Sequence, residues 1–226
     1  MALVLGGLLV SYPSAGRSQA APFSQGERLV YAIKKMGVKA GEATLTYAGA
    51  QRLEDKNVEL IVFTANAANF YDEEKIYVDP QTFRPVQVVR DLNIWGKKEK
   101  ITEYYEAGKV RIVKNAGGKT EEQIIQKNDA LDNLYGFIYR YRRDGRFQIG
   151  ESLQMNLPTQ DVTIKLANMD QIKAGGGTHT AYYMQSDPKK YKVWFDSSPQ
   201  RIPLRIDGAV GFGNTSMVLR DYKQAG

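Results

Sequence analysis

Hydrophobic and polar residues alternate along most of the chain. Ala43, Leu45 and Tyr47, for example, are each separated by a threonine. A period of two residues is typical of a β-strand with one buried face, because successive side chains of a strand point to opposite sides of the sheet. This alternation, or a short hydrophobic run between turn residues, predicts strands over residues 28–35, 43–47, 57–65, 74–79, 84–93, 99–106, 109–114, 120–126, 153–157, 162–166, 179–186, 190–196, 202–206 and 213–222.

One of these predicted strands is hydrophobic on both faces. The run Leu60–Phe63 contains no polar residue, so we expect its strand to lie centrally and to be covered on both sides. Turn residues such as Asp79–Pro80 and Gly117–Gly118 separate the strands at short intervals, which favours antiparallel pairing of successive strands. An antiparallel sheet of about a dozen strands has to curl, split or close. The pattern therefore predicts a mainly β fold with one large curved antiparallel sheet, a half-barrel or an open barrel.

A single segment departs from the strand pattern. Over residues 129–142, hydrophobic residues recur at helical spacing: Leu131, Leu134, Tyr135 and Ile138. Asn128 or Asp129 can cap the start of this helix, and Gly145 is placed to end it. We expect the helix to pack onto the sheet or to fill its hollow. Because no linker or internal repeat divides the chain, residues 21–226 are expected to form a single β-rich domain.

The first twenty residues have a different character. Residues 2–10 form a short hydrophobic run, and Ser18-Gln19-Ala20 then offers small residues where a signal peptidase cleaves. We expect residues 1–20 to be a signal peptide and the mature chain to begin at Ala21, in the periplasm or elsewhere in the cell envelope. The alternative is an N-terminal segment that is disordered or packed in the core. No stretch of the mature chain has the ~20 apolar residues of a membrane-spanning helix.

The composition leaves little material for catalysis. The chain has no Cys and one His, which excludes disulfides, thiolate nucleophiles and Cys-ligated metals. The lone His179 is not part of a recognisable Ser-His-Asp arrangement, so we expect it to be dispensable. The acidic run Asp72-Glu73-Glu74 lacks the spacing of a calcium loop and is interpreted as a solvated turn. The sequence therefore predicts no catalytic residue, no cofactor site and no metal site.

The basic residues point to structure more than to a ligand. The net charge is +6, and the densest basic cluster is Arg140, Arg142, Arg143 and Arg146. This cluster falls in the last turn of the predicted helix and just beyond it, where cations interact favourably with the carbonyl end. We therefore interpret it as structural, and we expect no nucleic-acid partner.

Both ends of the mature chain carry a family resemblance. The segment Leu29–Ala43 has a Tyr-bearing strand, a Gly turn and then Ala-Gly-Glu-Ala, and the closing segments are Val193–Asp196 and Arg201–Ile206. These segments resemble the opening and closing signatures of a bacterial exported family known as domain of unknown function 3108. The resemblance implies a signal peptide, a curved antiparallel sheet and a cell-envelope location. It implies no activity and no catalytic residues.

Aromatic residues are the one feature that suggests a ligand. The chain has 14 Tyr, 8 Phe and 2 Trp, and adjacent aromatic pairs on predicted strands send one ring to each face. Core packing accounts for most of these rings, but rings on a concave face can line an apolar pocket. The candidate ligand-binding residues are Tyr105, Tyr182, Trp194 and Phe195.

Three functions from different classes follow. The leading one is a non-enzymatic envelope protein that binds an apolar ligand, such as a lipid, or a lipidated partner on its curved sheet. The second is an envelope assembly or structural factor that binds another protein through an exposed edge or face. The third and weakest is a hydrolase of cell-wall polymer. A contiguous cavity would favour the first, an open edge or exposed apolar patch the second, and a cleft with converging carboxylates the third.

Overall fold

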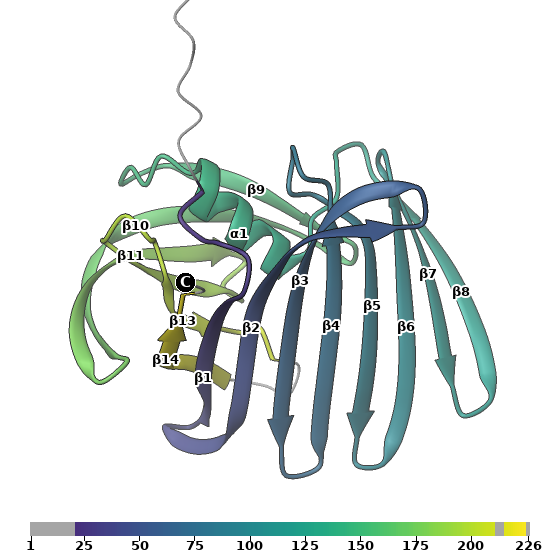
Figure 1. The fold of residues 1–226 in the computed structure, drawn as a ribbon, viewed down its shortest axis with the longest axis horizontal. Helices are drawn as coiled ribbons and strands as arrows, with labels where there is room; N and C mark the ends of the chain where they lie inside the picture. Colours follow the sequence, from purple (N-terminus) through teal and green to yellow (C-terminus); the bar gives the residue numbers. More distant parts are fainter. Residues whose placement is uncertain (1–20, 211–214, 225–226) are drawn as a thin grey trace, which may run out of the picture.

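The computed structural model describes residues 21–210 and 215–224, which form one antiparallel sheet and one helix (Figure 1). The elements are β1 (Glu27–Lys35), β2 (Val38–Leu53), β3 (Lys56–Ala67), β4 (Phe70–Val78), β5 (Pro85–Ile94), β6 (Lys97–Glu106), β7 (Lys109–Ala116), β8 (Lys119–Gln126), α1 (Leu134–Asp144), β9 (Ser152–Leu157), β10 (Gln160–Ala174), β11 (Gly177–Asp187), β12 (Lys192–Asp196), β13 (Pro203–Asp207) and β14 (Thr215–Lys223). Each predicted strand corresponds to one of these strands.

The strands follow one another around the sheet in chain order, with one long-range junction. The order is β8-β7-β6-β5-β4-β3-β2-β1-β14-β13-β12-β11-β10-β9, and the sheet is not closed into a barrel. The junction is the antiparallel pair β1–β14, which sets Arg28 opposite Lys223. The first and last strands are therefore neighbours in the middle of the sheet, and two wings extend from them.

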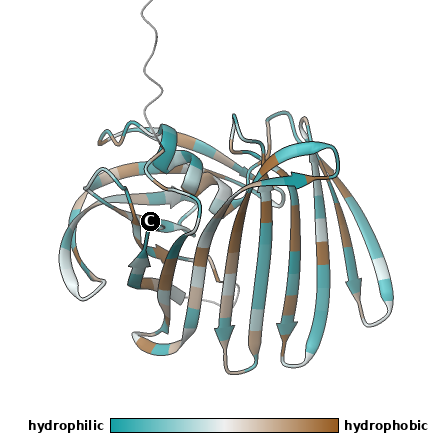
Figure 2. Cartoon of the chain, in the orientation of Figure 1, coloured by the Kyte–Doolittle hydropathy of each residue, from teal (hydrophilic) through white to brown (hydrophobic). Residues whose placement is uncertain are grey.

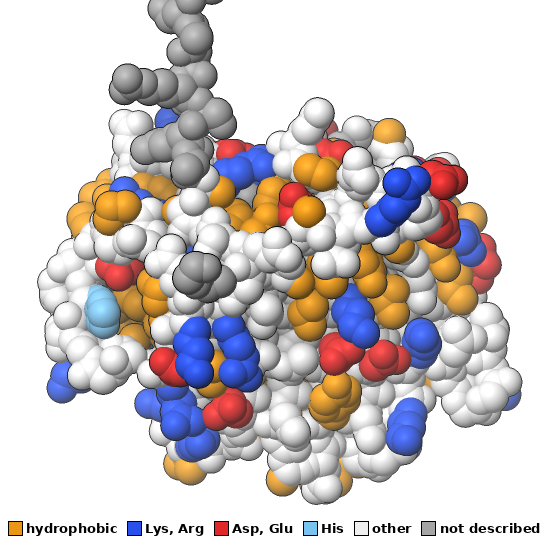
Figure 3. Space-filling model, viewed as in Figure 1, with side chains coloured by type: hydrophobic (Ala, Val, Ile, Leu, Met, Phe, Trp, Pro, Cys, Tyr) orange, Lys and Arg blue, Asp and Glu red, His pale blue; other side chains and the backbone are white. Residues whose placement is uncertain are grey.

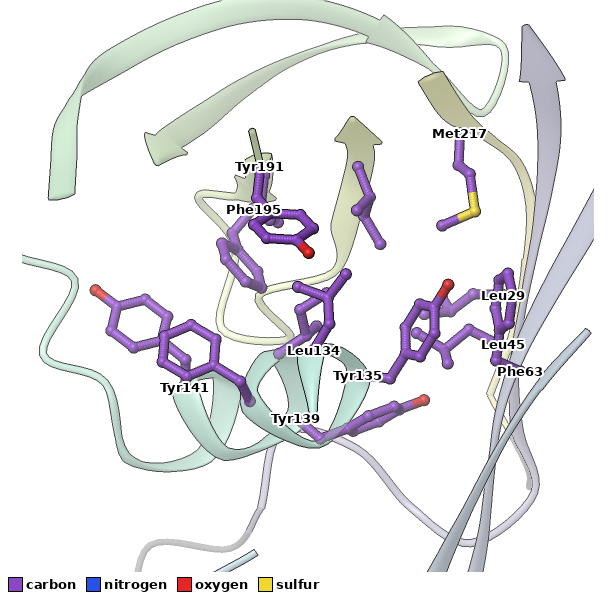
Figure 4. Close-up of a cluster of buried hydrophobic side chains, with 14 of the residues drawn as sticks. Leu29, Leu45, Phe63, Leu134, Tyr135, Tyr139, Tyr141, Tyr191, Phe195 and Met217 are labelled. Atoms are coloured by element: carbon purple, nitrogen blue, oxygen red, sulfur yellow. The ribbon is translucent and has the colours of Figure 1, made fainter. Parts of the chain in front are cut away.

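The helix lies between the two wings of the curved sheet. Brown and teal segments alternate along many of the strands in Figure 2, so most strands have one hydrophobic face. The hydrophobic face turns inward, where Tyr135 of α1 lies towards Leu45 and Phe63 in one wing and Phe195 belongs to the other wing (Figure 4). The prediction of a curved antiparallel sheet with a single packed helix is confirmed.

The helix begins later than the spacing predicts. It starts at Leu134, and its cap is Asn133, whose side-chain oxygen accepts hydrogen bonds from the backbone of Tyr135 and Gly136. The predicted caps Asn128 and Asp129 are wrong because these residues lie in a bend several residues before the helix, and the segment that follows is bonded elsewhere. The backbone N–H of Asp132 donates to the carbonyl oxygen of Asn156 at 2.7 Å. Gly145 ends the helix as predicted.

A buried ion pair fixes the other end of the helix to the sheet. Arg142 Nη1 and Nη2 donate to the two carboxylate oxygens of Glu27 at 2.6 and 2.8 Å, and neither side chain is exposed. The hydroxyls of Tyr139 and Tyr222 donate to the same carboxylate at 3.2 and 3.4 Å. We call Glu27, Tyr139, Arg142 and Tyr222 the closed cluster.

The expectation that β3 is covered on both faces is wrong. Ile61 and Phe63 are fully buried, but Leu60 and Val62 are only half-buried, because α1 covers the inner face of β3 and nothing comparable covers its outer face. Gly41 lies within β2. A Cβ atom there would collide with the backbone carbonyl of Asn66, so Gly41 permits a close approach of two strands.

The predicted signal peptide, residues 1–20, lies outside the described residues. Among the residues that are described, no helix has the length and hydrophobicity required to span a membrane.

Candidate functional site

A pocket of about 380 Å³ opens beside the start of the helix. Strands β4 to β7 form one wall, and the other walls come from α1 and from turns of the opposite wing. We call it the inner pocket. It is lined by Glu74, Val88, Arg90, Glu103, Tyr105, Ile112, Asp132, Asn133, Leu134, Tyr135, Leu157, Pro158, Thr159, Lys190, Tyr191, Gly208 and Ala209.

Charged side chains form one side of this pocket. Arg90 donates from Nε and Nη2 to both carboxylate oxygens of Asp72, at 2.7 and 2.5 Å, and Asp72 is 1% exposed. The Arg90 Nε atom also lies 3.4 Å from a carboxylate oxygen of Glu74. Glu103 accepts a hydrogen bond of 2.5 Å from the hydroxyl of Tyr105. We call Asp72, Glu74, Arg90 and Glu103 the open cluster, in which one guanidinium pairs with two carboxylates and a third carboxylate lies close enough to feel its charge.

Strand pairing explains how these residues meet. The β4–β5 hairpin pairs Glu74 directly with Arg90, and Asp72 lies two residues away on the same face of β4. Glu73 points to the outer face, where it pairs with Lys75 at 3.2 Å. The interpretation of Asp72-Glu73-Glu74 as a solvated turn is therefore wrong. The run lies in a strand, and the alternation that identified other strands was the signal that could have placed its acids.

Burial raises the pKa values of two carboxyl groups in the open cluster. Burial is the main cause that raises the pKa of Glu74 to about 7. The positive charge of Arg90 opposes the rise, and repulsion from Asp72 and Glu103 adds to it. Burial also raises the pKa of Glu103, although the hydrogen bond from Tyr105 and the charge of Arg90 oppose the rise. Near neutral pH, the open cluster can therefore either take up a proton or bind another cation.

Tyr135 presents an unsatisfied polar group to the same site. Its side chain is 2% exposed and its ring stacks on Phe63 at 4.2 Å between centroids. In the described part of the chain its hydroxyl has no hydrogen-bond partner. A buried hydroxyl without a partner costs about 1–3 kcal/mol, so the missing partner needs an explanation. A ligand in the inner pocket would supply one.

The structure separates the four aromatic candidates. Tyr105 lines the inner pocket, but the other three do not. Phe195 is fully buried in the core and packs on Tyr141 and Phe147, and Tyr182 packs on Phe147 near it.

Trp194 lies on the outer face of the sheet. It stacks on Tyr183 at 4.8 Å, lies under the guanidinium of Arg205 and donates from Nε1 to Asp170 at 3.1 Å. A ligand-binding role for Tyr182, Trp194 and Phe195 stays a prediction.

The arginine cluster and His179 lie away from the inner pocket, except where Arg140 bonds Asp132 at its edge. Arg140 Nη1 lies 2.6 Å from a carboxylate oxygen of Asp132, and Arg142 belongs to the closed cluster. Arg143 donates from Nε and Nη2 to the two carboxylate oxygens of Asp144, both at 2.7 Å. These arginines are held by carboxylates more than by helix carbonyls. His179 Nε2 lies 3.1 Å from the carbonyl oxygen of Ala174 in the β10–β11 hairpin.

A second hollow is larger but less defined chemically. It has about 610 Å³ and lies beyond the end of α1, between Arg146, Phe147 and Arg201. The charges of Arg142 and Arg143 on its wall are already neutralised by Glu27 and Asp144. Among the described residues, no group of His, Asp and Glu side chains has the arrangement of a metal site.

Comparisons with known proteins bear on the fold. The family described as "Protein of unknown function (DUF3108)" matches residues 29–220. A β-barrel-like protein of domain of unknown function DUF1849 from Brucella abortus is similar over 90% of this chain and 99% of that chain, with a TM-score of 0.54 and 8% identity. A candidate lipoprotein from Parabacteroides distasonis is similar over 89% and 98%, with a TM-score of 0.31 and 11% identity. No curated protein matches the sequence.

Proposed function

The chain belongs to the DUF3108 family, and we propose that it is a non-enzymatic binding protein of the bacterial cell envelope. Its ligand is an amphipathic molecule with a hydrophobic chain and a cationic amine head group, held in the inner pocket. Export follows from the predicted signal peptide at residues 1–20. The chain from residue 21 onwards contains every described helix and strand.

The observation that carries the proposal is the surplus of negative charge in the open cluster. Arg90 is the only guanidinium in that cluster, and it already uses two donors on Asp72. Arg90 therefore does not fully compensate the charges of Glu74 and Glu103, and burial raises the pKa values of both groups. A bound ammonium group would supply the missing charge and hydrogen-bond donors at once.

The remaining walls suit the hydrophobic part of such a ligand. Val88, Ile112 and Leu134 line the pocket together with Leu157 and Tyr191. A volume of about 380 Å³ falls in the range of small-molecule sites. Burial of a methylene group contributes about 0.8 kcal/mol, so a short alkyl chain is enough for useful affinity.

Two probes of opposite charge and equal chain length test the proposal. Titration calorimetry is done with octylamine and with octanoate, and octylamine is expected to bind about tenfold more tightly or better. Glu103→Gln should weaken octylamine binding. Glu73→Gln, which removes a carboxylate from the outer face of β4, is the matched control and should bind as the natural protein does.

Native mass spectrometry of the protein purified from its own envelope adds an unbiased measurement. A bound mass should disappear on delipidation. Equal binding of both probes would contradict the proposed head group. The absence of any bound mass, together with no binding of either probe, would contradict the binding function itself.

The pocket also favours one second candidate. It brings carboxylates together in a cleft, and Glu74 has the pKa of a general acid near neutral pH. Hydrolysis of cell-wall polymer is therefore the alternative. It ranks second because Asp72 and Glu74 share Arg90, and Glu103 is held by Tyr105. Release of soluble fragments from purified peptidoglycan, abolished by Glu74→Gln, would reverse the ranking.

The open edge of the sheet gives less support to an assembly factor. Strand β8 is an edge strand, and its exposed side chains include Lys119, Glu121 and Glu122. Charged residues on an edge strand discourage the addition of a further strand.

A further inference from the structure

Two hairpins at one end of the sheet expose large hydrophobic residues. Successive turns of an antiparallel meander alternate between its two ends, so the β1–β2 and β5–β6 turns share one end, the lower edge in Figure 1. Met36 occupies the first turn and is 92% exposed, and Trp95 occupies the second and is 77% exposed. Val38 and Ile94 beside them are also exposed.

Both residues adopt a backbone conformation that does not suit them. Each hairpin has a two-residue loop, Met36-Gly37 or Trp95-Gly96, in which both φ angles are positive, between 50° and 82°. Loops of this kind favour Asn or Asp before the Gly, because a large side chain is strained in the left-handed region. Because Met36 and Trp95 are exposed, their side chains contribute little to the packing of the hydrophobic core. Strain kept at exposed positions points to a contact outside the chain.

The residues around these loops are basic. Residues 33–40 contain Lys34, Lys35 and Lys39, residues 93–98 contain Lys97 and Lys98, and neither segment contains an acid. Figure 3 shows basic and hydrophobic side chains along this edge of the molecule.

Two further features of this edge are the acidic residues in the adjoining strands and the β3–β4 turn between the two hairpins. Two neighbouring acids in the strands are paired, Glu99 with Lys114 at 2.9 Å and Glu42 with Arg220 at 2.8 Å. The backbone N–H of Trp95 donates to the carbonyl oxygen of Asn69, which links this loop to the β3–β4 turn between the two hairpins.

We propose that this edge, residues 34–39 and 94–98, docks onto the surface of an anionic lipid bilayer. Met36 and Trp95 enter the boundary between head groups and acyl chains, and the lysines lie against anionic head groups. Tryptophan suits that boundary because its ring is apolar and its N–H is polar. Each lysine near an anionic surface adds attraction that salt weakens. The proposal does not depend on the ligand of the inner pocket.

The test uses the chain from residue 21, which contains every described element, and vesicles of two compositions. Flotation with equimolar phosphatidylglycerol and phosphatidylcholine should recover the protein, and vesicles of phosphatidylcholine alone should recover much less. Raising the salt concentration should reverse the binding. In a Trp194→Phe background, the emission of Trp95 should shift to the blue on addition of the anionic vesicles.

Two variants separate this role from a role in folding. Met36→Asn and Trp95→Asn place the residue that the turn favours, so each should raise the melting temperature, yet together they should lower vesicle binding about tenfold or more. Ile149→Asp, a change at an exposed hydrophobic residue far along the chain, should leave binding unchanged.

Three outcomes would overturn the proposal. These are no binding to either vesicle, equal binding to both, or full binding by the double Asn variant. Octylamine binding in the absence of vesicles is measured separately, so failure of the docking edge is distinguishable from failure of the inner pocket.

Discussion

Two arginine–carboxylate clusters lie at opposite ends of the same helix and differ in balance. In the closed cluster, one arginine faces one carboxylate, and every oxygen of Glu27 accepts a hydrogen bond from Arg142 or a tyrosine. In the open cluster, one arginine pairs with two carboxylates, Asp72 and Glu74, and Glu103 adds a third negative charge near it. The hydroxyl of Tyr135 beside this cluster has no partner in the described chain.

Complete pairing of charges marks a structural ion pair, and incomplete pairing beside a pocket marks a binding site. Burial costs an ion pair several kcal/mol per charge, and only complete pairing offsets that cost. The closed cluster meets this condition without help. The open cluster leaves Glu74 with a pKa of about 7 and opens to a pocket, so its imbalance is the feature that a ligand can correct.

The largest effect on stability is expected from a substitution that breaks the closed cluster. Glu27→Gln leaves the guanidinium of Arg142 buried without a counter-charge, and arginine does not lose its proton. We expect a loss of about 3–5 kcal/mol in the free energy of unfolding. Urea denaturation at neutral pH measures it, with Glu121→Gln on exposed β8 as the control. A loss no greater than that of the control would contradict the structural role.

A smaller effect of opposite sign is expected in the open cluster. The pKa of Glu74 is about 7 in the folded chain and 4.5 when unperturbed, so the folded state holds a proton that the unfolded state releases. Stability should therefore fall as pH rises from about 4.5 to 7, on the order of 2 kcal/mol from this group.

Glu74→Gln should remove that part of the slope and should make the protein more stable than the natural chain at pH values above 7. Denaturation midpoints across this range measure both effects. Glu73→Gln on the outer face of the same strand should keep the natural slope. A slope that is unchanged in Glu74→Gln would show that another group carries it.

The smallest effect on stability is expected from removing the hydroxyl groups of two tyrosines in the helix. The hydroxyl of Tyr139 donates to Glu27, so Tyr139→Phe should cost about 0.5–1.5 kcal/mol or somewhat more, because the acceptor is charged. Tyr135→Phe removes a hydroxyl without a partner and should cost nothing or stabilise the fold, while it weakens octylamine binding. Thermal unfolding and calorimetry of both variants check the pair, and equal losses of stability would remove the distinction between the clusters.

The sequence predicts the strands well because alternation is a local property. Ala43 and Leu45 reveal their strand without any knowledge of their neighbours, whereas the start of the helix depends on a distant contact. Asp132 is bonded to Asn156 and Arg140, and this moves the cap to Asn133.

The candidate site was harder to predict for a related reason. Acids in a row suggest solvent, and only the register of the β4–β5 hairpin shows that Glu74 faces Arg90. Aromatic rings are conspicuous in a sequence, which is why the sequence points to Tyr105; it lines the inner pocket, and its role in ligand binding stays a prediction. The charged residues around it become a site only when the strands are paired.

The pairing of β1 with β14 also shapes how the chain must assemble. Within each wing, every strand meets the next strand of the chain, so those contacts close short loops. Arg28 and Lys223, in contrast, come from opposite ends of the sequence. Each doubling of loop length adds about 0.6 kcal/mol of closure entropy, and folding slows as contacts become more distant. We therefore expect the two wings to form early and separately, and the seam between them to be the late step that joins them around the helix.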